Sequence, residues 1–140
     1  MKEDKIDFMD LVTGSFLAAA FVWAWINASR IIDVHQAAFP IQAALSMLQY
    51  AFFVVGGLTA SYIVSRKTRR ASAWTGLKIG IGAWIISSTL FLPLSETITI
   101  PVVLMTLVAF LAGSHLGIKL FQRRNRKEAI SYTKRPEHGP

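Results

Sequence analysis

Two ionisable side chains, His115 and Lys119, stand four residues apart within a largely apolar stretch of the chain. A spacing of four places both side chains on one face of an α-helix. Inside a membrane, a protonatable pair of this kind can relay a proton or bind an anion. In the structural alternative, the histidine hydrogen-bonds to a neighbouring helix and the lysine extends its amine to the membrane surface. We favour the structural alternative and keep the pair as a candidate transport site.

A second candidate site consists of polar side chains in the halves of three apolar segments that lie farthest from the basic loops. Its members are Asn27, Arg30, Gln42, Ser46, Gln49 and Ser87–Thr89. Polar groups are costly in hydrocarbon, so each of them needs a partner. Together they can line an outward-open pocket, with Arg30 close to Asp33 or Glu96 at its rim. The simpler interpretation is hydrogen bonding between helices, worth about 0.6 kcal/mol per contact.

Residues for other chemistries are lacking. The chain has no cysteine, which excludes disulfides and thiolate-bound metals. It contains no HExxH, P-loop or GxGxxG motif, and no carboxylate falls inside an apolar stretch. We therefore expect no enzymatic activity, no cofactor and no metal site. Trp84, in the middle of an apolar stretch, is expected to pack between helices rather than to stack on a ligand.

Four apolar segments must position these residues, at 11–32, 41–65, 73–92 and 100–121. With a rise of 1.5 Å per residue, each segment can cross a hydrocarbon core about 30 Å thick. Their centres are apolar on every face, as in Val102–Ala112, where only Thr106 is polar. A chain of 140 residues is too short to bury such helices in a water-soluble core. The sequence therefore predicts an all-α integral membrane protein.

Short connections between the segments make consecutive helices antiparallel and predict an up-down-up-down bundle of four transmembrane helices. We divide the chain into an N-terminal segment (1–10), a transmembrane domain (11–121) and a basic tail (122–140). The N-terminal segment carries more acidic than basic side chains. Because a signal peptide begins with positive charge, we do not expect the first span to be cleaved.

Lysine and arginine are distributed unequally between the two sides of this bundle. Twelve lie on the side that holds both termini and the middle loop, and only Arg30 lies on the other. The positive-inside rule makes the richer side cytoplasmic. We therefore expect both termini in the cytoplasm and the protein in the plasma membrane of a prokaryote.

The basic residues of the cytoplasmic side are expected to contact anionic lipid headgroups or an acidic protein partner. They are Arg66, Lys67, Arg69, Arg70, Arg123, Arg124, Arg126 and Lys127. No aromatic residues alternate with them as a base-stacking surface would require, so we do not expect binding to nucleic acid.

Small residues recur every four positions along all four segments, a pattern that favours close approach of helix backbones in lipid. In the fourth segment Gly113 and Gly117 form a GxxxG pair, and His115 is displaced by about 200° from Gly113 around the helix. The expected packing positions are Gly57, Gly76, Gly80, Gly113 and Gly117. They indicate packing inside one bundle or, alternatively, a seam between identical copies.

From these features we expect a small, non-enzymatic membrane protein that serves as an accessory, assembly or scaffolding subunit of a membrane complex. The alternative is a small transporter or channel for an ion or a small solute. It would be oligomeric, because a single four-helix bundle encloses little room for a path.

Overall fold

The chain forms four α-helices in a computed structural model that describes residues 7–32, 39–69, 72–91 and 100–133. The helices are α1 (Phe8–Ile32), α2 (Phe39–Thr68), α3 (Ala73–Phe91) and α4 (Ile100–Thr133). All regular structure in these ranges is helical, which confirms the predicted all-α class and the predicted number of helices.

Helix α4 continues well past the end of the fourth apolar segment at residue 121. It has 34 residues and ends at Thr133, so the first part of the predicted tail is helical. Arginine, lysine, glutamine and glutamate, which are good helix formers, dominate this part of α4. Arg124 Nε also donates to Glu128 Oε1 at 3.0 Å across one turn. The hydropathy of the sequence marks where apolar residues end, which is not where the helix ends.

Three of the four helices are long and apolar enough to cross a membrane: α1 as far as Ile31, all of α2, and α4 as far as Ala129. Helix α3 is not among them. It is the shortest helix, with 19 residues, and it contains Lys78 and the glycines at 76, 80 and 82. The prediction of four membrane-spanning segments is therefore supported for α1, α2 and α4 and not for the segment at 73–92.

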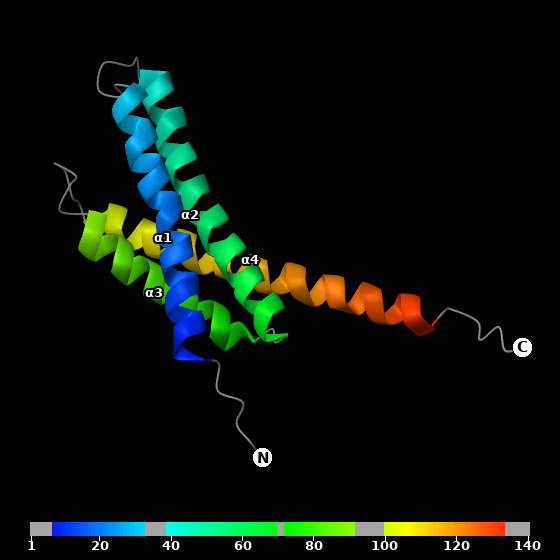
Figure 1. Ribbon diagram of the computed structural model, residues 1–140. Helices are drawn as coiled ribbons and strands as arrows, with labels where there is room; N and C mark the ends of the chain where they lie inside the picture. The colour runs from blue at the N-terminus through cyan, green and yellow to red at the C-terminus, as the bar shows by residue number, and fades with distance from the viewer. Residues whose placement is uncertain (1–6, 33–38, 70–71, 92–99, 134–140) are drawn as a thin grey trace, which may run out of the picture.

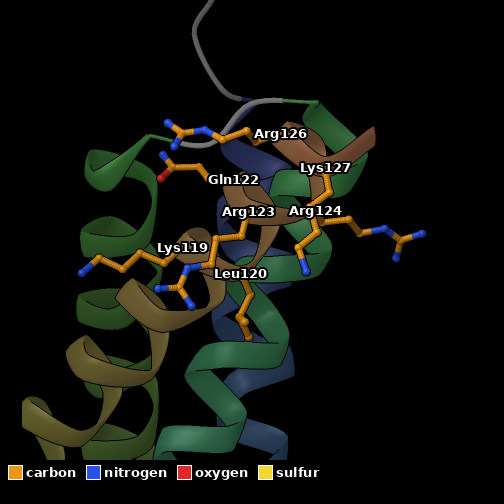
Figure 2. A pocket seen from close by; sticks show the side chains of 7 residues that line it. All are labelled: Lys119, Leu120, Gln122, Arg123, Arg124, Arg126 and Lys127. Carbon is orange, nitrogen blue, oxygen red and sulfur yellow. The ribbon is translucent and has the colours of Figure 1, made fainter. Parts of the chain in front are cut away.

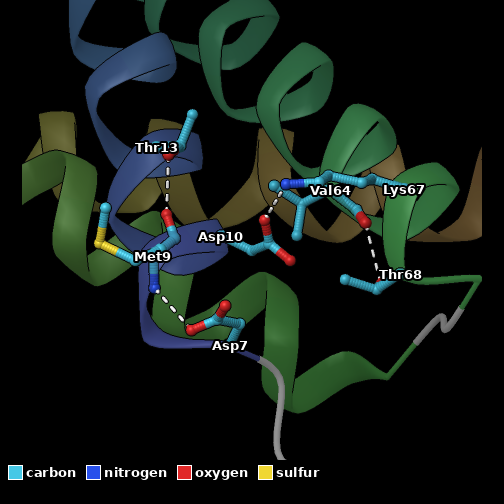
Figure 3. Close-up of polar contacts among 7 residues, drawn as sticks. All are labelled: Asp7, Met9, Asp10, Thr13, Val64, Lys67 and Thr68. Carbon is cyan, nitrogen blue, oxygen red and sulfur yellow. Dashed lines mark hydrogen bonds and ion pairs between the residues drawn. The ribbon is translucent and has the colours of Figure 1, made fainter.

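Local hydrogen bonds define where two of the helices begin. The Asp7 carboxylate accepts the backbone N–H of Met9 at 3.3 Å and so caps α1 (Figure 3). The Ser72 hydroxyl accepts the backbone N–H of Trp74 at 3.2 Å and caps α3 in the same way. Helix α2 ends before Arg69, whose φ of 54° lies in the left-handed region that commonly terminates a helix.

The helices form two hairpins, α1 with α2 and α3 with α4, and the two hairpins cross (Figure 1). Helix α2 packs on α1 and α4, and α3 also packs on α1 and α4, whereas α2 and α3 touch only slightly. The order around the bundle is therefore α1, α2, α4, α3. Phe53 stacks on Phe110 at the crossing, with ring centroids 5.4 Å apart. The core around this pair also contains Ala18, Val22, Ala60, Val64, Ile79, Ala83 and Ala109.

The beginning of α1, the end of α2 and the last part of α4 lie at one end of the molecule, called here the basic end. Lys67 Nζ donates to Asp10 Oδ1 at 2.5 Å across α1 and α2 (Figure 3). Arg124 Nη1 donates to Tyr62 Oη at 2.9 Å across α2 and α4. These two contacts hold three helices together where the basic residues gather.

The hairpins separate at the opposite end. The beginning of α2 stands well apart from the beginning of α4 (Figure 1). None of the residues 39–52 in α2 or 100–108 in α4 is buried. The packing between α2 and α4 is therefore confined to the part of each helix that lies towards the basic end.

Candidate functional site

Two glycines of α4 lie directly against the backbone of α2. A Cβ atom at Gly113 would collide with the carbonyl oxygen of Val54, and a Cβ atom at Gly117 would collide with that of Leu58. Both contacting pairs are offset by 59 residues, as expected for helices that run in the same direction. The α2–α4 seam is therefore a parallel GxxxG contact formed within one chain.

Ser114 lies where α2 and α3 both approach α4. Its Oγ is 3.1 Å from the position that a Cβ would take at Gly57, and 3.2 Å from the corresponding position at Gly80. Its carbonyl oxygen is 3.2 Å from a Cβ placed at Gly76. The structure thus gathers three of the glycines named from the sequence around one serine that sequence analysis did not single out.

Five buried hydroxyl groups have no hydrogen-bond partner within the described residues: those of Ser61, Ser65, Thr75, Ser87 and Ser114. Other helical hydroxyls donate to a carbonyl of their own helix, as Thr13 does to Met9 at 2.7 Å and Thr89 does to Ile85 at 2.8 Å. Leaving a buried hydroxyl unpaired costs about 1–3 kcal/mol. These five hydroxyls are the buried side-chain polar groups that lack a partner among the described residues.

Ser61 and Ser65 follow Gly57 at intervals of four residues on α2, so they belong to the small-residue pattern of the second apolar segment. The residue type at these positions indicates more than small size. A stripe that needs only small size can use alanine, whereas this one places serine at both positions after Gly57. Both serines are fully buried, with 0% of their surface exposed.

His115 and Lys119 lie on the outside of the bundle, and both are exposed. His115 lines a groove between the beginning of α3 and the middle of α4, together with Trp74 and Leu77. Lys119 lies with the basic residues of α4 and extends towards the side where α3 begins (Figure 2). The pair therefore faces away from the α2–α4 seam and not into the interior between the helices.

At the opposite end, two polar side chains donate hydrogen bonds to carbonyl groups of their own helices. Asn27 Nδ2 donates to the Trp23 carbonyl at 2.8 Å, and Ser46 Oγ donates to the Gln42 carbonyl at 2.9 Å. Gln49 is half-buried and Arg30 is exposed. The expected rim partners Asp33 and Glu96 lie outside the described residues.

The α3 members of that polar set lie at a different depth. Helices α1 and α3 run in the same direction, and Gly82 lies against Ser15. Counting five residues along each helix places Ser87 level with Ala20, roughly 10 Å short of Asn27 at 1.5 Å per residue. The structure therefore does not bring Ser87 and Asn27 to the same depth.

Trp84 connects α3 to α4. Its indole N–H donates to the carbonyl oxygen of Val103 at 3.1 Å, and the same oxygen accepts the Thr106 hydroxyl at 2.7 Å. An indole N–H buried in hydrocarbon needs such an acceptor. Trp84 is thus a packing residue with a satisfied polar group.

Basic side chains cover the basic end on two helices. Arg66 and Lys67 lie on α2, Arg69 directly follows it, and α4 carries Arg123, Arg124, Arg126 and Lys127; all seven are exposed. Arg70 lies outside the described residues. Lys67 and Arg124 are ion-paired with acidic side chains.

Within the described ranges, no group of three or more histidine or acidic side chains is placed to hold a metal ion. Comparison of the chain with protein-family models, with curated proteins and with solved structures finds no match.

Proposed function

We propose that this chain is an integral membrane protein that serves as a non-enzymatic accessory, assembly or scaffolding subunit of a membrane complex. In this proposal all four helices reside in the plasma membrane and the basic end faces the cytoplasm. Three apolar helices and the concentration of exposed lysine and arginine at one end support this placement.

The observation that carries the proposal is the separation of α2 from α4 away from the basic end. Met47 lies seven residues before Val54, and Val102 lies eleven residues before Gly113, so both are on the faces that form the α2–α4 seam. Met47 is nevertheless 75% exposed, and Val102 is only half-buried. An apolar wedge between two helices is the kind of surface into which a helix of another membrane protein can pack.

The packed half of the bundle supports the same conclusion. At Gly113 and Gly117 the two backbones leave no room for even one added carbon atom. A path for a solute between α2 and α4 would require these helices to move apart. The α2–α4 seam therefore leaves no space for a passage where the two glycines lie, and this favours a role that depends on exposed surface.

Photo-crosslinking in native membranes tests the proposal. A photoreactive residue at Met47 or Val102 should form an adduct with one discrete polypeptide different from this chain. Ile63, which is 46% exposed on α2 at the packed half, is the matched control and should react only with lipid. Lipid adducts alone at all three positions would contradict the proposal.

The alternative, a small oligomeric transporter or channel, is favoured by the unpaired hydroxyls of Ser61, Ser65, Thr75 and Ser114. Crosslinks from Met47 to a second copy of the chain, together with a symmetric oligomer in mild detergent, would support it. So would an ion flux in proteoliposomes that Ser114→Ala abolishes without lowering stability. Purification with a larger complex and no flux would instead support the accessory subunit.

A further inference from the structure

A groove of about 600 Å³ runs between the beginning of α3 and the middle of α4. It lies on the outer surface of the bundle, beside the basic end. Its lining residues are Ser72, Ala73, Trp74, Leu77, Leu111 and His115. The volume falls in the range of about 300–1,000 Å³ that is typical of small-molecule sites.

Along one stripe of α4, the residues change from an apolar side chain in the groove to cationic side chains beside it. Leu111, His115 and Lys119 follow one another at intervals of four residues, and Arg126 falls on the same stripe two turns further on. Each interval of four residues advances about 6 Å along the helix. An apolar floor, a hydrogen-bonding middle and a cationic rim are thus arranged in order towards the membrane surface.

The cationic side chains beside the groove extend towards α3. Figure 2 shows the side chains of Lys119 and Arg126 extending to the side of α4 on which α3 begins. The beginning of α3, with its partial positive charge, opens at Ser72 on the opposite wall. Trp74 is 65% exposed, and indole rings prefer the headgroup region of a bilayer.

We propose that this groove binds one molecule of an anionic phospholipid. The acyl chain lies on Leu77 and Leu111, the ester region adjoins Trp74 and His115, and the phosphate contacts Lys119 and Arg126. A free phosphate would leave the apolar floor unused, and a zwitterionic lipid would carry its own cation to the basic rim. The lipid site does not depend on the accessory role. It rests only on the proposed placement of the basic end at the headgroup level of a membrane.

Native mass spectrometry of the full-length protein in detergent, titrated with phosphatidylglycerol or phosphatidylcholine, tests the site. We expect one phosphatidylglycerol to be retained in preference to phosphatidylcholine. Lys119→Gln should weaken its binding about fivefold, which corresponds to about 1 kcal/mol per basic residue at a membrane surface. Lys127→Gln is the comparison variant. Lys127 belongs to the same basic surface of α4 but is displaced by about 80° from Lys119 around the helix, so its loss should weaken binding clearly less than Lys119→Gln does.

A second variant tests the apolar part. Ala73→Phe places a ring in the groove at an exposed position of α3 and should remove the retained lipid while leaving the thermal stability within the range of the unmodified protein. Equal losses for Lys119→Gln and Lys127→Gln would show diffuse attraction to the basic surface and would overturn the proposal. Unchanged lipid retention in a stable Ala73→Phe protein would do the same.

Discussion

The tightest test of the packing is the replacement of single glycines by alanine at positions whose surroundings differ. At Gly117 an added Cβ would collide with the carbonyl oxygen of Leu58 and would lie only 3.1 Å from its carbonyl carbon and Cα. At Gly80 the nearest atom is a terminal methyl carbon of Leu111, at 3.0 Å. Backbone atoms cannot move without displacing the helix, whereas a leucine methyl group can rotate away.

The two substitutions should therefore have different effects on the free energy of unfolding. Glycine to alanine in a helix interior is worth about 1 kcal/mol of stabilisation when nothing obstructs it. Overpacking against rigid surroundings costs about 1–3 kcal/mol, and contact with a backbone falls at the upper end of this range. We expect Gly117→Ala to destabilise the protein by about 1–2 kcal/mol, and Gly80→Ala to be neutral within about 0.5 kcal/mol.

Gly113 provides an internal check on this reasoning. Its Cβ would collide with the Val54 carbonyl on the same seam, so Gly113→Ala should resemble Gly117→Ala. A single outward shift of α4 would relieve both collisions. The double variant should therefore lose less stability than the sum of the two single variants.

Unfolding by sodium dodecyl sulfate in mixed micelles, followed by far-ultraviolet circular dichroism, measures these differences. If Gly113→Ala and Gly117→Ala raised the stability as much as an unobstructed substitution should, both glycines would face lipid. The parallel α2–α4 seam would then be wrong. Gly80→Leu, which adds four carbon atoms, should still be destabilising, because the methyl group of Leu111 cannot yield that much space.

Three further predictions follow from the same features. The chain contains no cysteine, so single cysteines at Ala37, Ser72 and Ser131 should react with an impermeant reagent outside intact cells only at Ala37; labelling at Ser72 would reverse the proposed orientation. Trp84→Phe should lower the free energy of unfolding by about 0.6 kcal/mol through loss of the bond to Val103, and a change above 2 kcal/mol would show that the indole does more than donate this bond. His115→Gln should leave both the fold and proteoliposome ion permeability unchanged, because His115 lies on the outer surface; a robust flux that this variant abolishes would favour the transporter.

The positions of individual site residues show how far sequence reasoning reached. Helical spacing was sufficient to place His115 on the side of α4 away from Gly113 and Gly117, because the angle between residues of one helix depends on that helix alone. It was not sufficient to place Asn27 and Ser87 relative to each other. Their separation depends on the register between α1 and α3, which is set by the contact of Gly82 with Ser15.

The sequence by itself determined the properties that belong to single segments. It predicted four helical segments, all of them as membrane spans, of which three are long and apolar enough to cross a membrane. It also predicted that the basic residues gather on one side of the bundle. Tertiary structure decided which helices are neighbours, so that α2 packs on α4 rather than on the consecutive α3. It also decided that Ser114 lies among three glycines of two other helices. Finally, it decided that α2 and α4 separate in the parts that precede Phe53 and Phe110 in the chain. Hydropathy describes one segment at a time, whereas packing depends on the rotation and the crossing of two helices that are distant in the chain.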